Sequence, residues 1–276
     1  MRSLRFDDPR LVTLTIMGLL AAFLWVAAWS VMGGTDFSIV ELCRSALTGT
    51  PLPAEARENL AILAAVLPPE GITPRLIAET GVMWLLMMAA MMLPAMSAVI
   101  ATYADIARIE HRGATLALRI GLFALSYFAL WGVFALVAAL MQLGVRGTAF
   151  FSHDGATAGP IAAGGLLLIA GAYQFTKLKE ACLSKCRQPM AFLMAEWRPG
   201  IAGAARIGAR HGLYCLGCCW ALMGLMFVFG AMNLWWMAAI AVYCAAEKIA
   251  PRADVWGKHA GAAMIAGGVW MLASQI

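Results

Sequence analysis

The amino-acid sequence predicts an all-α fold, a polytopic transmembrane helical bundle of about seven spans with its N-terminus inside. The amino-acid composition indicates that the protein is a membrane protein. Of the 276 residues, 62% are hydrophobic and 13% are charged, which is more apolar than the surface of a soluble domain tolerates. The hydrophobic segments are also long enough for helices of about 20 residues, whereas strands of a membrane barrel would alternate over roughly 10 residues.

We expect a single membrane domain over residues 1–276. The spans are predicted at residues 11–32, 81–104, 120–142, 160–178, 212–230, 234–246 and 260–276. The apolar core of the first segment is too long for a cleaved signal peptide, so we expect a retained span. Residues 33–80 are predicted to form an extracytoplasmic loop interrupted by prolines, and residues 179–211 a cytoplasmic connector.

The distribution of positive charge gives the orientation. With the N-terminus inside, sixteen of the 20 Lys and Arg residues fall in inner segments and four in outer segments. This asymmetry is typical of a membrane protein whose basic residues stay on the cytoplasmic side. The net charge of +5 is explained by this topology, and we expect no nucleic-acid partner.

Five of the seven cysteines lie in two short clusters, Cys182-x3-Cys186 and Cys215-x2-Cys218-Cys219. In a reducing cytosol, clustered thiols are metal ligands or redox-active groups more often than structural disulfides. Residues three or four apart share one face of a helix, and the two spans that carry the clusters are antiparallel neighbours. The sequence therefore predicts one site of soft thiolates, which selects Cu(I), with zinc as the second choice.

Further side chains are weaker candidates for the same site. Met88, Met92 and Met96 recur every four residues and Met223 follows Cys219 by one turn, so thioethers line the predicted helices. Methionine in an apolar helix is usually packing material, which is the alternative interpretation. His211 lies one turn before Cys215, where it would be either an imidazole ligand or a solvated residue. The isolated Cys43 and Cys244 are predicted to be small buried apolar residues.

Three motifs resemble a known family. They are MMAAMMLP at 87–94, YQFTKLK at 173–179 followed by Cys182, Cys186, Arg187 and Pro189, and GLYCLGCCW at 212–220. Together they resemble an uncharacterised group of bacterial proteins described as predicted metal-binding integral membrane proteins. The resemblance covers most of the chain after Gly81, and it implies a multi-pass protein of the bacterial inner membrane.

From these observations we expect a membrane protein that binds Cu(I) through the clustered cysteines and acts in copper handling or delivery. Its predicted partners are the lipid bilayer and a metallochaperone or larger membrane complex. No phosphate-binding loop or aspartyl-phosphate domain is present, so we do not expect an ATP-driven pump. We expect a binding role in preference to a catalytic one, with the enzyme alternative given below.

Two alternatives remain open. In a membrane thiol-disulfide oxidoreductase, Cys215 and Cys218 would cycle as a Cys-x-x-Cys pair with Cys182 or Cys186 as partner. As an accessory or assembly subunit of a larger membrane complex, the protein would not depend on the cysteines for association.

Overall fold

A computed structural model describes residues 72–152, 155–231, 233–250 and 253–275, together with Gly18, Ala21, Ala22 and Trp25. Most of the predicted first span and most of the loop at 33–80 therefore lie outside the described residues, as does Cys43. The described residues are helical apart from turns and one isolated bridge between Phe151 and Ala158. The all-α prediction is confirmed for this part of the chain.

The part of the chain that the structure describes from residue 72 onward contains nine helices. They are α4 (Pro74–Ala107), α5 (Gly113–Val145), α6 (Pro160–Tyr173), α7 (Lys177–Arg187), α8 (Pro189–Glu196), α9 (Gly200–Gly224), α10 (Met226–Phe229), α11 (Leu234–Ile249) and α12 (Ala253–Ala273). The N-terminus of α4 is capped by Thr73, whose side chain accepts from the amide of Leu76, and Pro74 suits its first turn. Residues 74–80 are thus helical, although the sequence predicted a loop there.

Three described helices are long and apolar enough to cross a membrane: Pro74–Ala107, Gly113–Val145 and the continuous segment Gly200–Phe229. A fourth is reached if α6 and α7 count as one span, but the two helices are bent by 66°. The helices α11 and α12 do not meet the same criterion, so the described residues do not support seven spans. The helix that carries Cys215 begins at Gly200, ahead of the span start predicted at Gly212.

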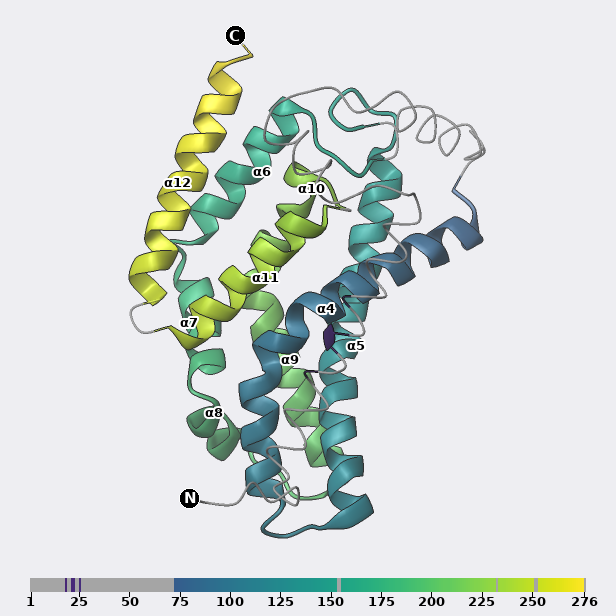
Figure 1. Cartoon of the computed structure of the whole chain (residues 1–276), viewed down its shortest axis with the longest axis vertical. Coiled ribbons are helices and arrows are strands. Elements are labelled where there is room, and N and C mark those ends of the chain that lie inside the picture. The colour runs from purple at the N-terminus through teal and green to yellow at the C-terminus, as the bar shows by residue number, and fades with distance from the viewer. Residues whose placement is uncertain are drawn as a thin grey trace.

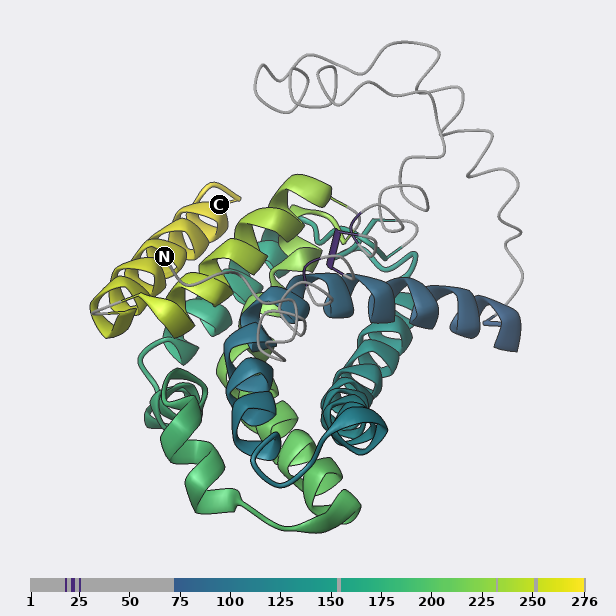
Figure 2. The same ribbon diagram turned by 60° about the horizontal axis from the view of Figure 1, so that its bottom comes forward.

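The long helix α5 packs against both α4 and α9, and α12 packs along α6 (Figure 1). The short helix α7 packs against α9, and α11 packs against α4 (Figure 2). The two segments that carry the cysteine clusters, α7 and α9, are therefore in contact, as the sequence predicted. The packing also brings α11, which was not expected to take part in the site, to the same region.

The buried face of α4 is rich in methionine. Met87, Met88, Met91, Met92 and Met96 are each at most 1% exposed. Unbranched thioether side chains fill the irregular space between helices that cross at different angles. The proline of this helix, Pro94, removes one backbone donor within the helix, and Figure 1 shows that α4 bends along its length. From this face, the Met92 side chain reaches Cys215 and Cys219 on α9.

Helices α5 and α9 approach each other closely at Gly208. A Cβ atom added there would lie 2.2 Å from the carbonyl oxygen of Phe123 and 2.4 Å from Ser126 Oγ. Such distances are shorter than any real Cβ contact, so the spacing of the two backbones depends on the missing side chain. The same approach fixes α9, and with it the second cysteine cluster, against α5.

We predict that Gly208→Ala lowers the free energy of unfolding by about 1–3 kcal/mol, because the added methyl group overpacks the contact with α5. The matched control is Gly224→Ala on the same helix, where an added Cβ would meet no atom within 4 Å. Detergent-solubilised protein titrated with denaturant and followed by helical circular dichroism measures both. Equal stability of the two variants would contradict this account of the helix spacing.

Candidate metal centre

The second cysteine cluster lies on one face of α9. Cys215, Cys218 and Cys219 are at most 2% exposed, and their Sγ atoms all lie within 4.8 Å of one another. The spacings of three and four residues produce this arrangement, because they place side chains on adjoining positions of a helix. Three buried thiols at this separation can coordinate a single metal ion.

Two of these thiols are hydrogen-bonded within their own helix. The Sγ atoms of Cys218 and Cys219 donate to the carbonyl oxygen of Cys215, at 3.1 Å and 2.8 Å. Each of these buried thiols therefore has a hydrogen-bond acceptor within its own helix. Loss of these protons would free both sulfurs as ligands without any change in the backbone.

A fourth soft sulfur comes from α4. Met92 Sδ lies 3.8 Å from Cys219 Sγ and 4.0 Å from Cys215 Sγ. The thioether is uncharged and prefers soft metal ions over hard ones. Met92 is therefore the predicted methionine that the structure brings to the cysteines. Met88, Met96 and Met223 are fully buried in the helical core, where we interpret them as packing residues.

The first cysteine cluster contributes from α7. Cys186 is 5% exposed, and its thiol is near enough to those of Cys215 and Cys218 to interact with them. Cys182 is half-buried and lies against the backbone of Gly217, outside the group of three sulfurs. Of the first cluster, Cys186 therefore lies next to the buried thiols of the second cluster, and Cys182 lies outside them.

Two polar groups from other helices converge on Cys215. The ammonium group of Lys248, on α11, donates to Cys215 Sγ at 3.0 Å, and the Tyr127 hydroxyl of α5 lies 3.0 Å from the same sulfur. Burial opposes the charge of Lys248, but the sulfurs of Cys215 and Cys218 outweigh it and hold its pKa well above the ordinary value. An ammonium group at this distance favours the thiolate form of Cys215.

Sequence reasoning did not assign these two residues to the site. Lys248 counted there only as a basic residue of an inner segment, and Tyr127 only as part of a span. No local motif points to either, because both reach Cys215 through contacts between distant helices. Cys244, predicted to be an ordinary buried residue, is buried on α11, and its thiol is near enough to that of Cys219 to interact with it.

His211 is close to the cysteines but outside the group of ligand atoms that lie together. Its ring is 1% exposed and packs against Tyr127, with ring centroids 5.5 Å apart. Among the described residues, Nδ1 of His211 is a buried nitrogen without a hydrogen-bond partner. His211 is therefore not a solvated residue, which was one of the two interpretations from the sequence. Its imidazole ring is buried and stacked against the ring of Tyr127.

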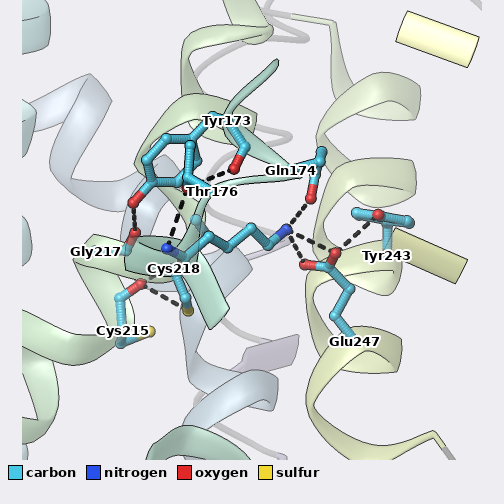
Figure 3. A network of polar contacts seen from close by, with 10 residues as sticks. Tyr173, Gln174, Thr176, Cys215, Gly217, Cys218, Tyr243 and Glu247 are labelled. Atoms are coloured by element: carbon cyan, nitrogen blue, oxygen red, sulfur yellow. Dashed lines mark hydrogen bonds and ion pairs between the residues drawn. The ribbon is translucent and has the colours of Figure 1, made fainter. Parts of the chain in front are cut away.

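A second polar network joins α7 to α11 (Figure 3). Lys179 Nζ lies 2.7 Å from Glu247 Oε1 and also donates to the Gln174 side-chain oxygen. The Tyr243 hydroxyl donates to the same Glu247 oxygen at 2.8 Å. Lys179 and Glu247 are each 3% exposed, and they border a pocket of about 190 Å³. The pair fixes the helix of Cys186 to the helix of Lys248.

A protein-family model, PpoB2, described as copper chaperone, matches residues 81–271, more than half of the chain. The chain belongs to this family. No curated protein and no solved structure matches it. Membership in a copper-chaperone family and the buried group of Cys215, Cys218 and Cys219 together indicate copper binding. The sequence resemblance to a metal-binding family agrees with this assignment.

We predict that Glu247→Leu lowers the free energy of unfolding by about 3–5 kcal/mol, because the charge of Lys179 is then buried without its carboxylate partner. The double variant Lys179→Met with Glu247→Leu should recover most of this loss. The matched control is Glu79→Leu, since Glu79 pairs with Arg75 on the exposed surface at 2.7 Å and such pairs contribute about 0–1 kcal/mol. Denaturant titration in detergent checks all three, and a double variant as unstable as the single one would contradict the prediction.

Proposed function

We propose that the protein binds one Cu(I) ion through the sulfurs of Cys215, Cys218 and Cys219, with Cys186 and Met92 beside them, and acts in copper delivery. The observation that carries the proposal is the buried group of three thiols within 4.8 Å, with a thioether 3.8 Å from one of them. Soft sulfur donors in a water-excluded site select Cu(I) over hard cations. The family described as copper chaperone supports the same metal.

Lys248 supplies a positive charge beside the proposed copper site. Two thiolates and one Cu(I) carry a net charge of −1, which the buried ammonium group beside Cys215 neutralises. If all three thiols of the group were ionised, the complex would carry −2, so the neutral complex has two thiolates and one protonated thiol. The preference for Cu(I) over zinc therefore rests on the soft sulfur donors and on the family description.

We place the protein in the bacterial inner membrane, with the lipid bilayer around its long helices. Three described helices have the length and composition to cross a membrane, and much of the exposed surface of α5 is apolar. The sixteen basic residues of the predicted inner segments favour a cytoplasmic position for α7 and α8. A metallochaperone on that side, or a larger membrane complex, is the proposed partner.

We predict that Cys219→Ala weakens Cu(I) binding on the order of 100-fold or more, and Met92→Leu by about tenfold, because each removes a sulfur beside the ion. Affinity is measured by competition with a colorimetric Cu(I) chelator, on anaerobically purified protein. The control is Met88→Leu on the same helix, equally buried and packed in the core, which should bind as wild type does.

Two results would contradict the proposed function. One is wild-type protein that takes up no stoichiometric copper. The other is a Met88→Leu variant that weakens binding as much as Met92→Leu, since the effect would then be one of packing. Metal-free protein with a disulfide between Cys215 and Cys218 would favour the oxidoreductase alternative.

We predict that Lys248→Met weakens Cu(I) binding by about 10–100-fold without removing a ligand, because the Cys215 thiolate loses its counter-ion. The control, Lys177→Met, removes an exposed charge from α7 and should leave affinity unchanged. The chelator competition at low and high salt separates the two, since a buried charge is poorly screened. Wild-type affinity in Lys248→Met would show that the lysine does not stabilise the thiolates.

A further inference from the structure

Among the cysteines that the structure describes, one differs from the rest in exposure. Cys182 is half-buried, whereas Cys186, Cys215, Cys218, Cys219 and Cys244 are all buried. A partner protein cannot bring its own thiolate to a buried sulfur without opening the helices. Copper that enters or leaves the buried group therefore needs an intermediate ligand that both sides reach.

Cys182 has this position because of Gly217. A Cβ atom added at Gly217 would lie 2.7 Å from Cys182 Sγ, so the sulfur occupies the space that the side chain of any other residue type at this position would fill. Gly217 directly precedes Cys218, and the Cys182 and Cys218 sulfurs are near enough to interact electrostatically. The half-buried thiol is therefore the outer neighbour of the buried group.

The contact is held in place by α6. The Tyr173 hydroxyl donates to the Gly217 carbonyl oxygen, and its ring packs edge-on against Trp220 with centroids 5.1 Å apart. Figure 3 shows Tyr173, Gly217 and Cys218 together at this point. The backbone of Gly217, against which Cys182 Sγ lies, is thus held by a helix that carries no cysteine.

We infer that Cys182 is the exchange thiol of this protein, the group through which Cu(I) passes between a partner's thiolate and the buried sulfurs. This inference rests on the proposed function. During loading, a bond forms between Cu(I) and Cys182 Sγ as the bond to the partner's sulfur breaks. The ion then binds Cys218 as Cys182 leaves, the proton of the incoming thiol passes to the departing thiolate, and copper stays Cu(I) throughout.

The test measures rate and affinity separately on the full-length protein in detergent, with Cu(I)–glutathione as the copper source. Cys182→Ser should slow loading roughly tenfold or more, because the accessible thiol is gone, and should leave chelator-measured affinity within about threefold. Ser184→Ala, an exposed change on the same helix, should load as wild type does. Gly217→Ala should slow loading in the same way, with Gly224→Ala as its control.

A second readout does not depend on copper. Brief alkylation of the folded apoprotein, with mass spectrometry of the peptides, should modify Cys182 well before the buried cysteines. Wild-type loading rates in Cys182→Ser would overturn the inference and leave the proposed function intact. A loss of affinity on the order of 100-fold would also overturn it, because Cys182 would then be a ligand of the stored ion. Wild-type protein that binds no Cu(I) would overturn the proposed function itself.

Discussion

The sulfur of Cys215 is the point on which the surrounding helices depend. It contacts the Lys248 ammonium group of α11 and the Tyr127 hydroxyl of α5, each at 3.0 Å, and lies 4.0 Å from Met92 Sδ of α4. Cys186 brings α7 to the same atom. A buried thiolate is stable only when cationic and hydrogen-bonding groups replace water around it. Side chains from α4, α5, α7 and α11 therefore all approach the Cys215 sulfur of α9.

Other contacts of the fold hold these groups at fixed positions around the sulfur. The close approach at Gly208 sets the distance between α5 and α9, and the methionines of α4 fill the remaining space. The buried pair of Lys179 and Glu247 joins α7 to α11 on the other side. The half-buried Cys182 lies at the edge of this packed core, where we infer that copper is exchanged.

Local sequence patterns predicted the helices and the thiol group, because both depend on spacing along one segment. Cys215, Cys218 and Cys219 share a face by their spacing alone, and Met92 follows from the methionine stripe. Lys248 and Tyr127 were not predicted, since their contacts join residues far apart in the sequence. The described residues support three or four of the seven predicted spans, and hydropathy revealed neither the 66° bend between α6 and α7 nor the start of α9 at Gly200.

The central claim is that copper is held as Cu(I) by sulfur alone. X-ray absorption at the copper edge, on anaerobically loaded wild-type protein, tests this most directly. The account predicts the edge of Cu(I) and a coordination shell made only of sulfur, because Cys215, Cys218, Cys219 and Met92 are the donors that lie together. A shell with nitrogen or oxygen ligands, or protein that retains no copper, would contradict it.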